Sequence, residues 1–168
     1  MSKEFNNGKV VVITGGAKKI GRATAKKLAD QGFNILIHTG GKSIDEAKKT
    51  VAIVKEYGVQ SDFIDGDLVD IKTIDKIKNA AEKLGTPSVL INNAGLRIHD
   101  DFEKITYEDW KKVMTVNVDA SFLCTQALIG HMTKQKWGRV INIGGLSAHI
   151  GAKERAHVVT SKAALIGL

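Results

Sequence analysis

The chain has 168 residues, with 25 lysines and arginines against 18 aspartates and glutamates, which gives a formal net charge of +7. Its 43% hydrophobic and 26% charged residues are typical of a soluble globular chain, and the length fits one domain, residues 1–168, with one core. The single cysteine excludes an internal disulfide and a cysteine-built zinc site, so we expect no metal.

The sequence carries no targeting or membrane signal. Its first ten residues are polar and charged, without the apolar stretch of a secretory signal. No apolar run approaches the roughly 20 residues of a membrane helix, so we expect a cytoplasmic protein without a membrane partner. The basic excess is spread over both halves and is not interleaved with aromatic residues, which argues against a nucleic-acid partner.

Short apolar runs alternate with stretches of helical periodicity along the whole chain. The runs are rich in β-branched residues and almost uninterrupted, as expected for strands of a parallel sheet that is covered on both faces. The pattern predicts a doubly wound α/β fold of the Rossmann type. The expected strands are residues 10–13, 33–37, 62–64, 89–91 and 140–143.

The helices between these strands carry recognisable boundary signals. Apolar residues follow helical spacing over residues 44–54 and 71–84. Ser43 is a predicted N-cap, and Glu46 three residues later would complete a capping box. Three glycines stand where helices should end, and the only proline, Pro87, is expected just before the fourth strand.

The last predicted helix starts near Ala156 and ends in an apolar stretch, residues 163–168. A terminus is usually solvated, so an apolar end needs covering by more protein. We therefore expect a chain cut short of its natural end; the alternative is a buried terminal helix.

A glycine-rich turn, residues 14–21 (Thr-Gly-Gly-Ala-Lys-Lys-Ile-Gly), follows the first strand and opens a helix. Glycines at such a turn let the backbone approach a pyrophosphate, and the helix N-terminus supplies N–H groups and a positive dipole. A plain tight turn is the alternative, but the position in the first βα unit favours dinucleotide binding.

The end of the second strand indicates which dinucleotide. An NAD site usually has a carboxylate about 20 residues past the glycine turn, to hold the ribose 2′-hydroxyl. Here no acid lies between Asp30 and Asp45, and His38, Lys42 and Ser43 stand there instead. Positive charge and hydroxyl donors suit a 2′-phosphate, so we expect NADP(H).

The sequence resembles the short-chain dehydrogenase/reductase family over residues 9–168. The resemblance is carried by the turn at 14–21, by Asn-Asn-Ala-Gly at 92–95, by Asn117 within Thr-Val-Asn-Val, and by Gly-Arg-Val-Ile-Asn-Ile at 138–143. Where the family's turn has its middle glycine this chain has Lys19, a variant similar to NADP-dependent pteridine reductases and some 3-oxoacyl-carrier-protein reductases.

The resemblance implies a cofactor site spread over four loops. The phosphates would lie against Gly15, Lys18, Lys19 and Ile20, and the 2′-phosphate against His38, Lys42 and Ser43. The adenine would lie against Asp67 and Leu68, and the ribose against Asn93, Ala94 and Gly95.

The catalytic end departs from the family pattern. There the acid is a tyrosine four residues before a lysine that also holds the nicotinamide ribose, a serine binds the substrate oxygen, and an asparagine holds a proton-relay water. Asn117 and Lys162 match, whereas Val158 stands at the tyrosine position and Gly145 at the serine position. Valine has no proton to give.

A histidine could replace the missing acid, because its unperturbed pKa of about 6.5 allows proton exchange with an alkoxide. His157 directly precedes Val158, although on a helix it points about 100° away. A helix residue with a backbone partner is the alternative interpretation. His149 is the other histidine considered for contact with substrate.

Two function classes follow from these motifs. The first is an NADP(H)-dependent oxidoreductase that acts on a carbonyl or alcohol with an atypical active site. The second is a catalytically inactive nucleotide-binding protein, a sensor or partner subunit. In the family the helices that contain Asn117 and Lys162 commonly pair between subunits, which implies a homo-oligomer for the chain extended to its full length.

Overall fold

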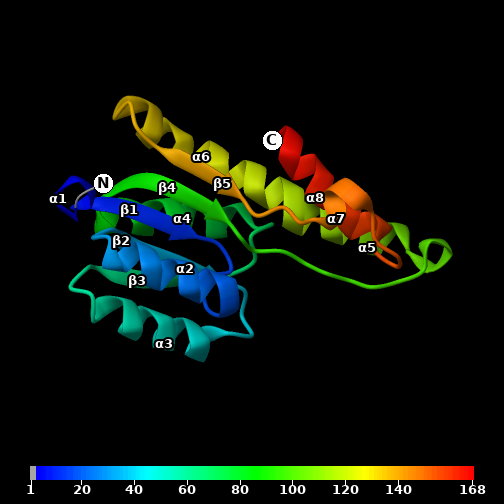
Figure 1. Cartoon of the computed structure of the whole chain (residues 1–168), viewed down its shortest axis with the longest axis horizontal. Coiled ribbons are helices and arrows are strands. Elements are labelled where there is room, and N and C mark those ends of the chain that lie inside the picture. Colours follow the sequence, from blue (N-terminus) through cyan, green and yellow to red (C-terminus); the bar gives the residue numbers. More distant parts are fainter. Residues whose placement is uncertain (1–2) are drawn as a thin grey trace.

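Five largely apolar stretches form a single parallel sheet in the computed structural model, which describes residues 3–168 (Figure 1). The strands lie in the order β3-β2-β1-β4-β5, so the chain winds from β1 first to one edge and then to the other. This confirms the predicted doubly wound α/β fold. The strands are β1 (Lys9–Ile13), β2 (Asn34–Thr39), β3 (Ser61–Asp65), β4 (Thr86–Asn92) and β5 (Arg139–Asn142).

Helices connect the strands and cover both faces of the sheet. They are α1 (Lys3–Asn6), α2 (Lys19–Asp30), α3 (Ile44–Lys55), α4 (Ile71–Leu84), α5 (Tyr107–Met114), α6 (Ala120–Lys134), α7 (Ser147–Ile150) and α8 (Ala156–Gly167). A short 3₁₀ turn (Phe102–Lys104) precedes α5, and a π-helical turn (Thr115–Asp119) joins α5 to α6.

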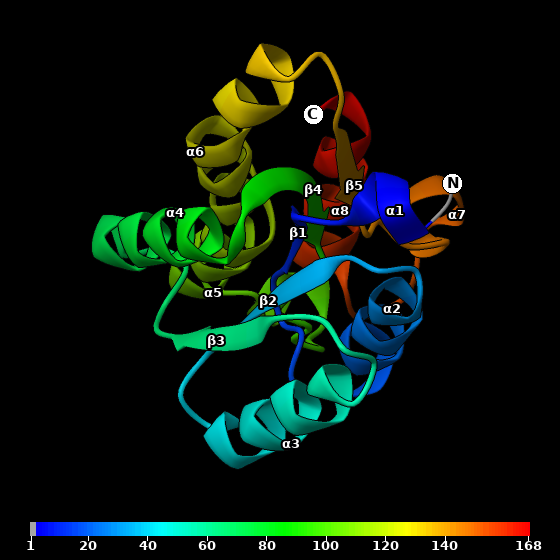
Figure 2. The ribbon, with the colours of Figure 1, turned by 90° about the vertical axis from the view of Figure 1, so that its left-hand side faces the viewer.

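Each face of the sheet packs on its own pair of helices. Because successive strand side chains point to opposite faces, Val11 and Ile13 pack with residues of α2 and α3, whereas Val10 and Val12 pack with α4 and α6. Figure 2 shows α2 on one side of the strands and α4 and α6 on the other. All four side chains are fully buried, which explains the uninterrupted apolar run of β1.

The predicted capping box does not form. Ser43 precedes α3 as expected, but its side chain makes no capping hydrogen bond. The Glu46 carboxylate instead accepts a bond from Arg22 of α2 at 2.6 Å and one from Lys49 at 2.8 Å. These bonds, that of Lys49 first, lower the pKa of Glu46 to about 2. A carboxylate is attracted more strongly to a cationic donor than to a neutral backbone N–H, and the bond to Arg22 links α3 to α2.

Pro87 lies inside the fourth strand and not before it. β4 starts at Thr86, and Pro87 pairs with Val10. The next pair is Val11 with Val89, so the register shifts by one residue at this point. Proline has no N–H for the ladder and is tolerated at the start of a strand or at a bulge, and both conditions hold here.

One long helical segment, Tyr107–Lys134, crosses the whole domain. By length and composition alone it could span a membrane, since an 18-residue window within it has a mean hydropathy of 1.2 and is 33% buried. A core helix of a soluble protein passes the same test. Its Cys124, Leu128 and Met132 are buried in the core beside α4, which favours the core interpretation.

The apolar end of α8 is only partly covered. Leu165 is 5% exposed, but Ile166 is 60% and Leu168 is 48% exposed. Half of this stretch therefore presents apolar surface to solvent.

Candidate functional site

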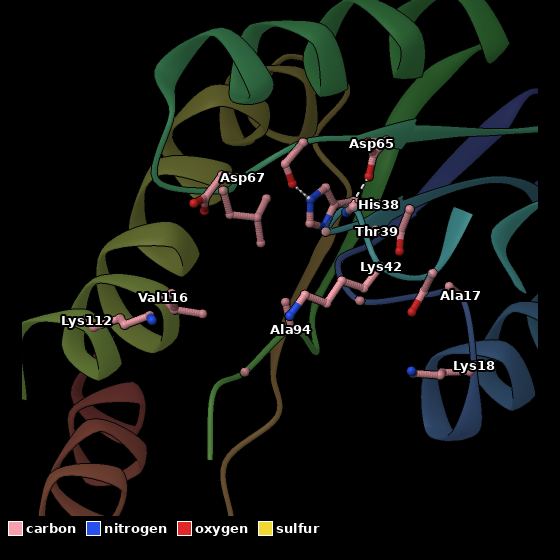
Figure 3. Close-up of a pocket in the computed structure, with 17 residues that line it drawn as sticks. Ala17, Lys18, His38, Thr39, Lys42, Asp65, Asp67, Ala94, Lys112 and Val116 are labelled. Carbon is pink, nitrogen blue, oxygen red and sulfur yellow. Dashed lines mark hydrogen bonds between the residues drawn. The ribbon is translucent and has the colours of Figure 1, made fainter. Parts of the chain in front are cut away.

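A cavity of about 670 Å³ opens at the carboxyl ends of β1 to β4 (Figure 3). In open parallel sheets this edge, where the strand order reverses, is where nucleotides bind. Four loops, α5 and the π-helical turn after it line the cavity. The lining residues are Gly15, Ala17, Lys18, His38, Thr39, Gly40, Gly41, Lys42, Ser43, Asp65, Gly66, Asp67, Leu68, Ala94, Gly95, Lys112 and Val116.

The glycine-rich turn needs its glycines for steric reasons. A Cβ on Gly15 would lie 3.0 Å from Ala94 Cα, and one on Gly21 would lie 2.5 Å from the Gly15 carbonyl oxygen. Gly15 also adopts a φ of +62°, which favours glycine. Lys19 adopts a φ of +50°, the left-handed conformation that the family's glycine would take without strain. The turn therefore keeps its shape although a lysine stands there.

Hydrogen bonds lock this turn to the loop after β4. The Asn93 side-chain amide donates to the carbonyls of Thr14 at 2.9 Å and Gly15 at 3.0 Å. The Thr14 hydroxyl in turn accepts from the backbone N–H groups of Asn93 and Ala94, both at 3.0 Å. Asn93 does not line the cavity but fixes the two loops that do.

The end of β2 presents a buried histidine and an exposed lysine. His38 is 3% exposed, its Nε2 lies 2.9 Å from the Gly66 carbonyl oxygen, and its Nδ1 has no partner among the described residues. Burial lowers the pKa of His38, so the ring is neutral near pH 7. Lys42 is exposed and lines the cavity with Ser43 and Lys18. The positive charge at this end therefore comes from the lysines.

Sequence reasoning missed two charged residues of the cavity. Asp65, the last residue of β3, lines it and accepts a bond from the Gly41 N–H at 2.5 Å. Lys112 lines it from α5. The strand-end position of Asp65 was a usable signal. Nothing in the local sequence around Lys112 marks it, because only packing brings α5 to this edge.

The structure separates the predicted cofactor residues into two groups. Lys19 and Ile20 do not line the cavity: Lys19 lines a separate groove with Arg22 and Tyr57 on the outside of α2, and Ile20 is 64% exposed. The others named from the sequence line it, apart from Asn93 and Lys162: Gly15, Lys18, His38, Lys42, Ser43, Asp67, Leu68, Ala94 and Gly95.

Asn117 is fully buried in the π-helical turn, and its side-chain amide is used in full by the protein. Its Oδ1 accepts from the Leu96 N–H at 2.7 Å. Its Nδ2 donates to the Leu96 carbonyl at 3.1 Å and to the Ser161 hydroxyl at 2.8 Å. This amide therefore joins the loop after β4 to α8.

Lys162 is a buried cation beside the cavity. It is 8% exposed, and its Nζ donates to the Ile143 carbonyl at 2.6 Å. The same Nζ lies 3.4 Å from the point that a Cβ on Gly95 would occupy. Burial, and secondarily the charge of Arg97, lower the pKa of Lys162. Gly95 lines the cavity, so the ammonium lies behind the Gly95 wall, on another loop than Lys18 after β1 and Lys42 after β2.

The residues around Val158, the position at which the family's tyrosine was expected, do not lie as a histidine proton donor would require. His157 is fully buried, and neither of its ring nitrogens has a partner among the described residues. The structure does not bring His157 to an open cavity. Val158 is 3% exposed. Gly145 has free space, since a Cβ there would meet only the Ser147 hydroxyl, at 3.7 Å. His149 is exposed on α7.

Comparisons with known proteins agree with this geometry. The family model described as short chain dehydrogenase matches residues 9–168. L-rhamnose 1-dehydrogenase (NADP(+)) of Thermoplasma acidophilum is 37% identical over 162 residues, which cover 95% of this chain and 63% of that protein. A 3-oxoacyl-[acyl-carrier-protein] reductase of Aquifex aeolicus is 35% identical over 165 residues, which cover 95% of this chain and 64% of the reductase.

Among solved structures, an NAD⁺-bound xylitol dehydrogenase superposes with a TM-score of 0.88 at 29% identity. The match covers 96% of this chain and 62% of that one. The chain thus spans a little under two thirds of the length of these relatives.

Proposed function

The chain belongs to the short-chain dehydrogenase family, and we propose that it is an NADP(H)-dependent oxidoreductase that interconverts a carbonyl and an alcohol. The observation that carries this proposal is the cavity at the strand ends, with the glycine turn as one wall and Lys162 beside Gly95, which forms part of another wall. When bound there, the cofactor supplies the hydride, and the chain supplies binding, orientation and the proton.

The residues present fit a dinucleotide phosphate. Gly15 lines the cavity and lies too close to Ala94 for a side chain, and the turn leads into the N-terminus of α2, which favours an anion. Lys18, Lys42 and Ser43 line the same cavity and would hold the 2′-phosphate. The buried imidazole of His38 would help to shape this end by contact and not by charge.

The preference for NADP(H) over NAD(H) rests on the chain's own charges. One relative is named for NADP⁺ and the solved structure is named as NAD⁺-bound, so kinship leaves the choice open. Asp65 and Asp67 are the carboxylates that line the cavity, and the Asp65 Oδ1 accepts the Gly41 N–H. Together with Lys112, the cavity has three lysines against these two carboxylates, and Lys18 and Lys42 would attract a phosphate at the 2′ position.

At the reacting end, Lys162 would hold the nicotinamide ribose while Asn117 holds the supporting loop and α8 in place. The proton requires another group, since Val158 and Gly145 carry none. His157 remains a proposal whose buried position offers it no contact with an open cavity. His149, exposed two residues past Ser147 on α7, is the alternative donor.

The same two replacements favour a second candidate function, a nucleotide-binding protein without turnover. In that case the cavity would bind the cofactor as tightly as in the first proposal. Loss of both the tyrosine and the serine, with retention of the cofactor loops, is what this function predicts.

The experiment that separates the two is direct. NADPH and NADH are first titrated by fluorescence, and NADPH oxidation is then followed with a panel of ketones, aldehydes, quinones and pterins. Binding with turnover supports the oxidoreductase. Binding without turnover supports the second function, and absence of binding contradicts both.

We also propose that a second copy covers α6 and α8. Phe122 and Ile129 of α6 and Ile166 of α8 are between 42% and 60% exposed, which is unusual for large apolar side chains gathered on two helices. Light scattering at several concentrations tests this, and a monomer at high concentration would contradict it.

A further inference from the structure

Two arginines on adjoining segments after β4 and before α8 have no acidic partner among the described residues. Arg97 stands two residues past Gly95, which lines the cavity; it is exposed and forms no hydrogen bond or ion pair with any described residue. Arg155 immediately precedes α8, and its Nε is buried without a partner among residues 3–168. Neither residue is accounted for by the cofactor site.

The segment that carries Arg97 is held firmly in place. On one side of it, Leu96 bonds through both its N–H and its carbonyl to the Asn117 amide. On the other side, the Asp100 N–H donates to the Glu154 carbonyl at 2.8 Å. Arg97 therefore lies between anchors on the π-helical turn and on the residue before Arg155. The two arginines are presented from adjoining backbone segments and not from a loose loop.

The carboxylates nearest in sequence do not neutralise these cations. Asp101 pairs with Lys104 at 2.6 Å. Asp100 accepts the N–H of Asp101 at 3.0 Å. Glu154 is exposed and forms no ion pair with any described residue. Neither arginine therefore forms an ion pair with these carboxylates.

Lys162 adds to this positive charge. Arg97 is close enough to lower the pKa of the Lys162 ammonium by repulsion, in addition to the larger effect of burial. Like charges held together without a counter-ion are unfavourable, and an anion bound between them would remove the repulsion. The cofactor's phosphates do not fill this role, because Lys18 and Lys42 lie with the glycine turn and β2 at the other end of the cavity.

We infer that the substrate of this site carries a carboxylate, held by Arg97, and that the protein acts on an oxo acid or hydroxy acid and not on a neutral ketone or sugar. The planar guanidinium presents paired N–H donors that match a carboxylate, and Arg155 adds positive charge from the adjoining segment. This inference rests on the proposed oxidoreductase function.

The test uses a matched pair of ketones, 4-oxopentanoate and pentan-2-one, which share five carbons and differ in the carboxylate. We expect NADPH oxidation to have a kcat/KM at least about tenfold higher for 4-oxopentanoate. In Arg97→Gln the KM for the oxo acid should rise about 10- to 100-fold, as expected for loss of a charge-assisted pair, while the KM for pentan-2-one stays unchanged.

Two control variants sharpen the result. Arg139→Gln removes an exposed arginine that donates to its neighbour's carbonyl at the start of β5, away from the site, and should change neither KM. Arg97→Lys keeps the positive charge but lacks the paired N–H donors of the guanidinium. Its KM for the oxo acid should therefore rise less than that of Arg97→Gln. NADPH affinity should be the same in all variants.

A binding measurement keeps this test independent of turnover. Saturation-transfer NMR on the protein with NADPH should show 4-oxopentanoate bound, and Arg97→Gln should remove that signal. Equal binding of the two ketones, or equal loss for both in Arg97→Gln, would overturn the inference. Oxidation of NADPH with pentan-2-one alone overturns the substrate class but keeps the oxidoreductase. Arg97-dependent binding without turnover keeps the anion site but contradicts the oxidoreductase.

Discussion

The two ends of the cavity differ in how much chemistry their residues retain. The end formed by the glycine turn, β2 and β3 has a close backbone approach, a helix N-terminus and two lysines, the features we propose for binding a phosphate-bearing cofactor. The end formed by the loop after β4 and by α8 has Lys162 and Asn117, and Val158 and Gly145 at the positions where the sequence resemblance predicts the family's acid and serine.

This difference shows that cofactor binding and proton chemistry depend on different parts of the chain. At the first end, we expect backbone N–H groups and the absence of a Cβ to do most of the binding, so the fold and the proposed function are tied together. At the second end the chemistry depends on single hydroxyl groups. Val158 packs as a buried α8 residue without one, so the fold survives whether or not the chemistry does.

The largest effect is expected from Lys162→Ala, which removes the one family group at the reacting end that adjoins the cavity. NADPH affinity should fall and turnover should drop by at least about 100-fold, the lower range for loss of a catalytic group. Stopped-flow and steady-state assays measure both. Lys153→Ala, which removes an exposed lysine before α8, serves as control; equal losses in both variants would contradict the role of Lys162.

The second largest effect is expected from restoring the two hydroxyl groups of the family pattern. Gly145→Ser and Val158→Tyr together should raise turnover by about 100-fold or more, because the Gly145 site has room for a side chain and Lys162 is already in place. The single variants should gain much less. If the folded double variant gains nothing, or loses activity, then a histidine-based mechanism or an inactive protein is the better explanation.

A moderate effect is expected at the end of the cavity that is formed by the glycine turn and β2. Lys42→Asp places a carboxylate beside the 2′ position, so NADPH affinity should fall about tenfold or more while NADH affinity changes little. Fluorescence titration of both cofactors measures this. Lys48→Asp makes the same charge change on α3, outside the cavity, and should leave the ratio unaltered. Equal affinities of the parent protein for NADPH and NADH would sink the proposed preference.

The smallest effect concerns His38 and pH. Burial lowers its pKa in the folded state, so the unfolded chain takes up the proton first and stability falls as the pH drops below about 6.5. Above that pH the histidine contributes no such change. Urea unfolding of the cofactor-free protein between pH 7.5 and 5 should show a smaller loss of stability in His38→Gln than in the parent. The exposed His99→Gln should behave like the parent.

Much of the architecture follows from local sequence. The β-branched runs predict all five strands, and the helical spacing of 44–54 and 71–84 matches α3 and α4 within a few residues. The exceptions have tertiary causes. Glu46 bonds to Arg22 of another helix and not to the start of its own, and Pro87 enters β4 because the strand absorbs it as a register shift.

What the sequence by itself determined is the sheet, the glycine turn and the valine four residues before Lys162, because each depends on residues that are neighbours in the chain. What only the tertiary structure decided is which side chains meet. It turned Lys19 and Ile20 away from the cavity, brought Lys112 and Asp65 to it, enclosed His157, and set Arg97 near Lys162. These placements depend on how helices pack on the sheet and on which way each side chain points, and neither property is written in the spacing of residues along a single segment.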